Sequence, residues 1–262
     1  MKKFFVNLAC AFIPMKKTRK AVRIKLIDKR ITKQELSIEE IAERVELLTM
    51  AMSDGYYGLL KLKMYHAKID PKYYYIFQEI NEGDICIDCG VNMGVVTDVF
   101  LHQRAEVYGF EPHEMLYPKL IDKYRHASTV TIHNMAVWDR NSELVFKRSQ
   151  SDSTHWHDTE GASLFVKVAD AVGFKVQVID LAEFIEKLLH EKGRPIHVLK
   201  LDVEGAEFEI IAKLIAKELH KSIKYILCET HERLFPDGEE KIKRLKQLIK
   251  EQEISNIHLD WV

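Results

Sequence analysis

The sequence predicts a doubly wound α/β fold with a mostly parallel sheet, preceded by a basic helical N-terminal extension. One observation is a change of pattern near residue 84, after which short apolar segments alternate with helical segments of about ten residues, which is typical of a parallel sheet. Another is the length of 262 residues with 47% hydrophobic content, which suffices for a large core. The third is the helical spacing of apolar residues before residue 80. We therefore expect an extension at residues 1–80 and the main domain at residues 81–262.

The extension begins with a strong positive charge. Ten of the 39 basic residues and one of the 40 acidic residues lie in residues 1–30, a net charge of +9, which leaves −10 on the rest of the chain. An apolar run at 4–13 is flanked by lysines and is far shorter than the ~20 residues that span a bilayer. This pattern fits either a helix in an anionic membrane interface or a helix docked on the domain. Further on, Ser37 and Glu40 form a capping box, and residues 37–66 are expected to be helical, as one helix or as two helices divided at Asp54-Gly55.

The elements of the main domain follow from apolar periodicity and from turn signals. An antiparallel insertion is expected in the middle, and Asp180 is expected to cap the helix after it. Strands are predicted at residues 85–88, 106–110, 129–133, 142–148, 164–168, 175–179, 197–202, 223–229 and, at the sheet edge, 254–261. Helices are predicted at residues 93–103, 113–124, 180–190, from 206 onward and at 238–251.

Polar segments follow the predicted strands where ligands bind in open α/β sheets, beyond the carboxyl ends. A glycine turn at 88–94 opens a helix, and Glu111 stands about 20 residues further on, where a carboxylate can accept hydrogen bonds from both ribose hydroxyls of a nucleoside. Because Gly90 and Gly94 do not fit the G-x-G-x-x-G spacing, a pyrophosphate clamp is weakly supported. Lys200 and Asp202 fall on one face of their strand by alternation.

Five motifs stand in order along the chain: D-x-G-x-N-x-G at 88–94, F-E-P at 110–112, N-x-A-V at 134–137, K-x-D-V-E-G-x-E at 200–207 and E-x-H at 229–231. Together they resemble the motifs of the FkbM family of S-adenosylmethionine-dependent methyltransferases. The resemblance covers about residues 80–235, with modest departures at Cys89 and Val91, and it implies a Rossmann-like methyltransferase fold.

The resemblance also implies roles for individual residues. S-adenosylmethionine would be the cofactor, and Asp202 and Glu204 would face its sulfonium and the acceptor. The cofactor residues are expected to be Asp88, Gly90, Asn92 and Gly94 for the methionine and ribose parts, Glu111 for the ribose hydroxyls, and Asn134 and Ala136 for the adenine pocket.

An alcohol acceptor benefits from a general base within reach of its proton. Glu229 is a candidate, and we favour Asp202, Glu204 and His231 as the catalytic group. Structural roles stay open: Lys200 and Asp202 as an ion pair, Glu204 as a helix N-terminal carboxylate, and Glu229 with His231 as a rim pair.

No metal site is expected. Cys86 and Cys89 match C-x-x-C, but residues three apart on a strand point to opposite faces. The histidines at 155 and 157, with acidic residues at 158 and 160, could bind a metal. We interpret this polar segment instead as a substrate-facing lid, in which Trp156 stacks on a sugar ring.

Together these features predict an O-methyltransferase that acts on a sugar hydroxyl of a small-molecule or glycan acceptor, in surface-polysaccharide or related glycan biosynthesis. We expect a cytoplasmic protein held at the inner membrane face through residues 1–30. The charge of −10 on the remaining residues argues against a nucleic-acid partner. The alternatives are a non-catalytic, membrane-recruited scaffold with a nucleoside-binding pocket and an NAD-dependent oxidoreductase. No pattern in the sequence indicates the oligomeric state.

Overall fold

The computed structural model describes residues 56–149 and 171–261. The residues from Lys63 onward form one compact unit. Several predicted features lie outside the described residues: the basic segment at 1–30, the helix from 37 as far as 55, the strand at 164–168, and the lid segment with its histidines.

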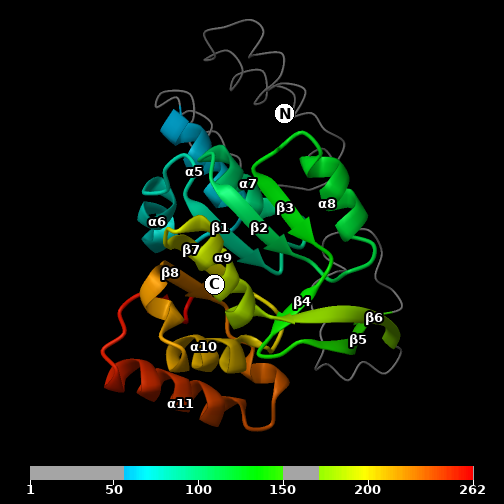
Figure 1. Ribbon diagram of the computed structural model, residues 1–262, viewed down its shortest axis with the longest axis vertical. Coiled ribbons are helices and arrows are strands. Elements are labelled where there is room, and N and C mark those ends of the chain that lie inside the picture. Colours follow the sequence, from blue (N-terminus) through cyan, green and yellow to red (C-terminus); the bar gives the residue numbers. More distant parts are fainter. Residues whose placement is uncertain (1–55, 150–170, 262) are drawn as a thin grey trace, which may run out of the picture. The chain divides into compact units, whose positions relative to one another are not determined.

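Helices and strands alternate along the described chain, as expected (Figure 1). The strands are β1 (Ile85–Cys89), β2 (Glu106–Phe110), β3 (Val130–His133), β4 (Ala136–Trp138), β5 (Ser142–Ser149), β6 (Ala171–Asp180), β7 (Ile196–Leu201), β8 (Ile223–Cys228) and β9 (Ile257–His258). The helices are α5 (Tyr56–His66), α6 (Tyr74–Gln78), α7 (Val95–His102), α8 (Tyr117–Tyr124), α9 (Leu181–Lys192), α10 (Glu207–Ala216) and α11 (Gly238–Glu251), with 3₁₀ turns η1 (Pro71–Tyr73), η3 (Leu219–Ser222) and η4 (Glu232–Leu234).

Within the described residues the main sheet has six strands in the order β3-β2-β1-β7-β8-β9, and every neighbouring pair is parallel. The chain builds outward from β1 to β3 in one direction and from β7 to β9 in the other, so the order reverses between β1 and β7. This confirms the doubly wound α/β fold. Ligands bind at such a switch point in open α/β sheets.

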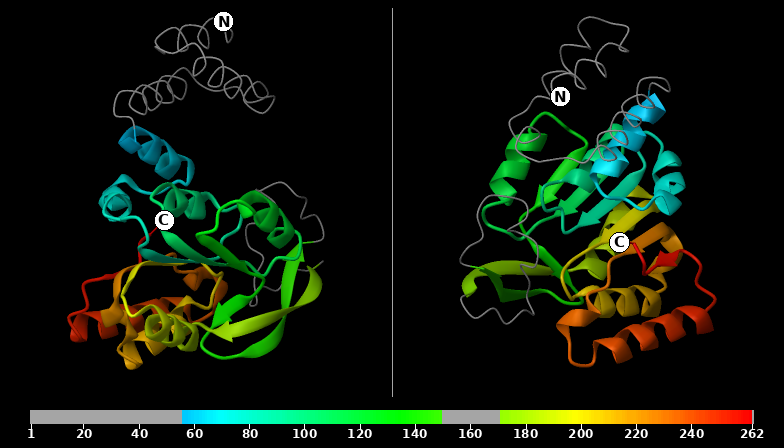
Figure 2. Two further views of the ribbon diagram at one scale, coloured as in Figure 1. Left: turned by 45° about the horizontal axis from the view of Figure 1, so that its top comes forward. Right: turned by 180° about the vertical axis from the view of Figure 1, so that it is seen from behind.

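Strand alternation decides which side chains reach the site. Ile85, Ile87 and Cys89 of β1 are buried in a large core together with residues of α9, α10 and α11. Asp88 points to the opposite face, where Thr97 of α7 donates a hydrogen bond to its carboxylate. Figure 2 shows α7 and α8 on one side of the main sheet and α9, α10 and α11 on the other. Polar groups at positions 88 and 200 therefore share the α7 face.

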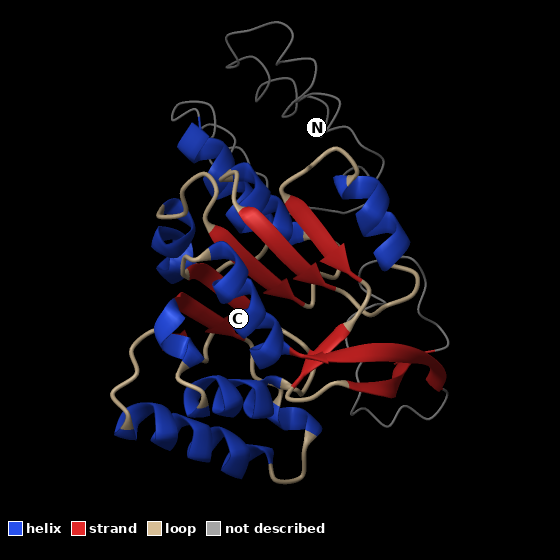
Figure 3. Ribbon diagram, in the orientation of Figure 1, coloured by secondary structure: helices blue, strands red, loops and turns tan. Residues whose placement is uncertain are grey.

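A second, smaller sheet has the order β4-β6-β5 and lies beside the main one (Figure 3). β5 and β6 are antiparallel, which confirms the predicted insertion. β4 pairs with β6 in parallel and was not predicted as a separate strand. The ring of Phe174 in β6 packs edge-on against His113, with ring centroids 5.8 Å apart. The insertion therefore lies next to the loop that follows β2.

The ends of several elements follow local rules. Asp180 caps α9 as expected, because its carboxylate accepts the backbone N–H groups of Ala182 and Glu183. The predicted edge strand at 254–261 is shorter than expected. Its end leaves the ladder, and the Asp260 carboxylate instead accepts a hydrogen bond from Lys72, over 2.8 Å. Among the described helices, none is long and apolar enough to cross a bilayer.

Candidate active site

Three acidic residues follow directly after strands and continue the ladder by one residue. The backbone N–H groups of Glu111, Asp202 and Glu229 donate to carbonyls at the ends of β3, β1 and β7, over 3.0, 3.1 and 2.9 Å respectively. Because the strands are parallel, these bonds hold all three residues at the carboxyl edge of the sheet. The sequence-based expectation that polar residues gather at this edge is confirmed for them.

The glycine turn after β1 packs against the backbone at the end of β7, the neighbouring strand in the sheet. Gly90 has a φ of +80°, and a Cβ atom there would lie 1.8 Å from the backbone oxygen of Asp202. Only glycine fits such a close approach in this conformation. Gly94 also has a positive φ, and its carbonyl accepts a hydrogen bond from the Tyr124 hydroxyl over 2.7 Å. Packing against Tyr124 therefore accounts for Gly94, and its role toward a cofactor stays a prediction.

Glu111 lies against this turn. Its carboxylate accepts the backbone N–H of Asn92 over 2.7 Å and that of His113 over 2.9 Å. Burial raises the pKa of Glu111 to about 7, although these two hydrogen bonds act in the opposite direction. Each carboxylate oxygen can accept more than one hydrogen bond, so Glu111 can also accept the hydroxyls of a ribose.

A buried cation lies beneath the turn. The ammonium of Lys200 is 3.3 Å from the Asp88 carboxylate and 3.2 Å from that of Asp202, and it donates to the carbonyl of Gly90 over 2.7 Å. Burial opposes the charge of Lys200, but Asp202 and Asp88 outweigh it and keep its pKa above the usual value. The ion pair considered as a structural alternative is therefore present, and it extends to Asp88, which is completely buried.

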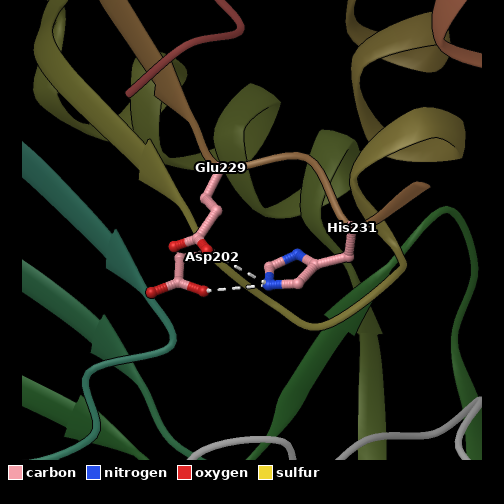
Figure 4. Close-up of side chains that lie close together, drawn as sticks. All are labelled: Asp202, Glu229 and His231. Atoms are coloured by element: carbon pink, nitrogen blue, oxygen red, sulfur yellow. Dashed lines mark ion pairs between the residues drawn. The ribbon is translucent and has the colours of Figure 1, made fainter. Parts of the chain in front are cut away.

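A second group surrounds His231, which is 1% exposed. Its Nε2 atom lies 3.8 Å from Asp202, 3.5 Å from Glu204 and 3.7 Å from Glu229. Figure 4 shows Asp202 coming from the end of β7, and Glu229 and His231 from the segment after β8. The structure thus brings together Asp202, Glu204 and His231, the three residues predicted as the catalytic group.

The other ring nitrogen of His231 is held by a residue to which the sequence assigned no role. The Nδ1 atom lies 2.7 Å from the carboxylate of Glu207, which is completely buried. Glu207 in turn accepts the backbone N–H groups of Val203 and Gly205, over 3.0 and 2.9 Å. Glu207 therefore fixes the orientation of the imidazole. The E-G-x-E spacing contained this residue, but its partner lies 24 positions further on.

The charged side chains around His231 shift one another's pKa values. Burial would lower the pKa of His231, but the hydrogen bond and charge of Glu207, together with Glu204 and Asp202, raise it to about 9. Burial raises the pKa of Glu204, and that of Glu229 is raised by burial and by Asp202. Glu204 also has a left-handed φ of +57°, an unfavourable conformation that is often retained at functional sites.

The two residues expected at the adenine pocket lie further along the edge. Asn134 donates from its side-chain amide to the backbone carbonyl of Glu111 over 3.0 Å. Ala136 lies in β4 and packs against Val176 and Val178 of β6. Asn134 therefore lies next to the loop that carries Glu111, and the contact of Asn134 and Ala136 with a cofactor stays a prediction.

Comparison with known proteins agrees with this arrangement. The methyltransferase FkbM domain matches residues 88–253, from the glycine turn through the end of α11. No curated protein and no solved structure matched the chain. Because the domain match covers more than half of the 262 residues and includes every strand end that forms the site, the chain belongs to the FkbM methyltransferase family.

Proposed function

We propose that this methyltransferase uses S-adenosylmethionine to methylate a hydroxyl oxygen, with a sugar hydroxyl of a surface polysaccharide or related glycan as acceptor. The observation that carries the proposal is the contact between the two halves of the carboxyl edge. The glycine turn with Glu111 touches the backbone of Asp202 at Gly90, and Asp202 belongs to the carboxylate group around His231. A nucleoside site and a hydroxyl-binding site would therefore share one wall.

The residues of the turn fit the proposed cofactor. Gly90, Asn92 and Gly94 all have positive φ angles, and the turn that they form is held against Glu111, whose carboxylate accepts the backbone N–H of Asn92. The Glu111 carboxylate beside them is suited to ribose hydroxyls. When bound, the cofactor supplies an electrophilic methyl group on a sulfonium. The carboxylates at this edge favour such a cation.

The carboxylate group around His231 supports an alcohol acceptor. Carboxylate oxygens accept hydrogen bonds from hydroxyls and can take the hydroxyl proton. Glu204 and Glu229 have raised pKa values, which makes them stronger bases than ordinary carboxylates. His231 with its pKa of about 9 balances part of their charge. We infer that a carboxylate accepts the proton while His231 positions it.

The test is a screen of sugar and glycan acceptors with S-adenosylmethionine, read by the mass gain of one methyl group. Glu204→Gln is expected to lower kcat at least 10-fold, and Asp202→Ala should abolish most of the activity. Glu218→Gln is the matched control, because Glu218 has the same left-handed φ (58°) but lies far out on the surface, paired with Lys221. Full activity in Asp202→Ala would contradict this assignment of the acceptor site.

Calorimetry separates the proposal from its alternatives. We expect S-adenosylhomocysteine to bind and NAD not to bind, and Glu111→Ala to weaken S-adenosylhomocysteine binding at least 10-fold. Binding of NAD alone would favour an oxidoreductase. Binding of S-adenosylhomocysteine with no methyl transfer to any acceptor would favour a non-catalytic scaffold.

We also propose that the segment at residues 1–30, with its net charge of +9, attaches the enzyme to the cytoplasmic, inner face of a membrane, where lipid-linked glycans are built. The proposal is supported by the lysines on both sides of the apolar run at 4–13, because basic residues near a membrane surface attract anionic lipid. Binding to anionic liposomes should be lost on deletion of residues 1–30 and should weaken at higher salt. Unchanged liposome binding by the deletion variant would overturn this idea.

A further inference from the structure

The ring of His231 faces several carboxylates without forming a hydrogen bond to any of them through Nε2. One oxygen each of Asp202 and Glu229 and a nitrogen of His231 all lie within 4.8 Å of one another. The Nε2 contacts of 3.5, 3.7 and 3.8 Å exceed the roughly 2.7–3.2 Å of an N–H···O hydrogen bond. A buried ring nitrogen therefore points toward three carboxylates at distances longer than those of a direct hydrogen bond.

These separations are close to those between ligands of one metal ion. Ligand atoms about 2.1 Å from a cation lie roughly 3.0 Å apart at octahedral angles and roughly 3.4 Å apart at tetrahedral angles. The contacts of Nε2 with the three carboxylates, at 3.5–3.8 Å, exceed the tetrahedral spacing by roughly 0.1–0.4 Å and the octahedral spacing by roughly 0.5–0.8 Å. A small inward movement of half-buried carboxylates would close the group around an ion.

The second, independent observation is the partner of the other ring nitrogen. Glu207 holds Nδ1 at 2.7 Å and is itself fixed by two backbone N–H groups. A metal-binding histidine commonly donates its other N–H to a carboxylate, which fixes the tautomer and directs the free nitrogen at the metal. Asp202 is oriented in a similar way, because its other oxygen lies 3.2 Å from the ammonium of Lys200.

We propose that Asp202, Glu229 and His231 bind one divalent cation of the first transition row, with Glu204 beside the ion as the base. One imidazole and two carboxylates suit Mn²⁺, Fe²⁺ or Zn²⁺ better than Ca²⁺, which takes oxygen ligands. Binding would displace the Nε2 proton to solvent. The sequence-based expectation of no metal site considered local spacing alone, whereas these ligands come from two strand ends.

The role of the cation rests on the proposed function. An acceptor hydroxyl bound to the ion would have a lowered pKa and a fixed position. Glu204 could then take the hydroxyl proton even as a weaker base. The residues proposed to bind the cofactor would be unaffected. The binding site itself does not depend on which acceptor the enzyme uses.

The experiment uses the full-length protein after removal of metals with EDTA. Titration with Mn²⁺, followed by electron paramagnetic resonance, should show one bound ion per chain and a ¹⁴N coupling from a histidine ligand. His231→Gln should remove the ¹⁴N coupling, and Asp202→Asn and Glu229→Gln should each weaken Mn²⁺ binding at least 10-fold. Glu218→Gln, an exposed control, should leave it unchanged. Should His231→Gln not fold, Glu229→Gln still tests the site, because that side chain is 26% exposed.

The proposal is overturned by the absence of stoichiometric Mn²⁺ binding, by the absence of a ¹⁴N coupling in the unsubstituted protein, or by equal Mn²⁺ affinity in all variants. Methyl transfer at full rate in EDTA, combined with no Mn²⁺ binding, would remove the metal site and leave the proposed function intact. Mn²⁺ binding without methyl transfer to any acceptor would remove the proposed function and leave the site.

Discussion

Lys200→Met tests whether the buried ion pair beneath the glycine turn stabilises the fold. The substitution keeps most of the length of the side chain but removes the cation. Asp88, whose side chain is 0% exposed, then keeps the hydrogen bond from Thr97 without a neutralising charge. Leaving one member of a buried pair uncompensated costs about 3–5 kcal/mol. That is a large part of the roughly 5–15 kcal/mol that stabilises a typical domain.

Denaturation in guanidinium chloride, followed by circular dichroism, measures this loss. The control is Lys224→Met, because Lys224 and Glu79 also form an ion pair, over 2.8 Å, but their side chains are 48% and 45% exposed. An exposed pair contributes about 0–1 kcal/mol. Asp88→Asn added to Lys200→Met should recover part of the loss, since it removes the unpaired charge. A cost for Lys200→Met no larger than that of Lys224→Met would refute the reasoning.

Three further outcomes follow from the geometry. Gly90→Ala should prevent folding or cofactor binding, whereas Gly193→Ala, also at positive φ but with nothing within 4 Å of its Cβ, should cost only about 1 kcal/mol in a thermal melt. The pKa of Glu111 is about 7 in the folded chain, above its ordinary value of 4.5. The folded chain therefore keeps this proton to a higher pH than the unfolded chain does, and the free energy of unfolding falls as the pH rises from 4.5 to about 7. Relative to Glu111→Gln, urea titrations should show the unsubstituted protein losing about 3 kcal/mol from pH 4 to pH 8, and a pH-independent difference would contradict the assignment. Burial raises the pKa of three thiols, which should react with a thiol reagent only after unfolding: Cys86, Cys89 and Cys228.

The sequence was most informative where a structure depends on neighbouring residues. The Asp180 cap could be predicted because it needs only the next three residues. β4 was missed because it pairs with β6, about forty residues away, and a three-residue strand leaves no local pattern. The helix predicted at 113–124 begins later, at Tyr117. The backbone N–H of His113 is instead bound by the Glu111 carboxylate, a contact that only the folded turn creates.

In the site, too, local features could be predicted from the sequence and long-range contacts could not. Asp202, Glu204 and His231 could be grouped in advance because each follows a strand, and parallel strands end at one edge. The role of Glu207 could not, because it depends on which ring nitrogen of His231 faces the helix. The metal-like spacing was also invisible, since it arises from the distance between two strand ends and not from residue spacing.

The contact of β1 with β7 also bears on how the chain folds. Lys200 binds carbonyls that lie 110 and 111 residues earlier in the chain, and the wide separation makes loop closure costly in entropy before any contact is formed. Pairs such as β1 with β2, or β7 with β8, are much more local. We therefore expect each half of the sheet to form first and the two halves to join late, which is typical of slow folding at high contact order. The pairing of β1 with β7, which creates the site, would then be the last part of the sheet to assemble. A chain that stalled before this step would expose the unpaired edges of β1 and β7.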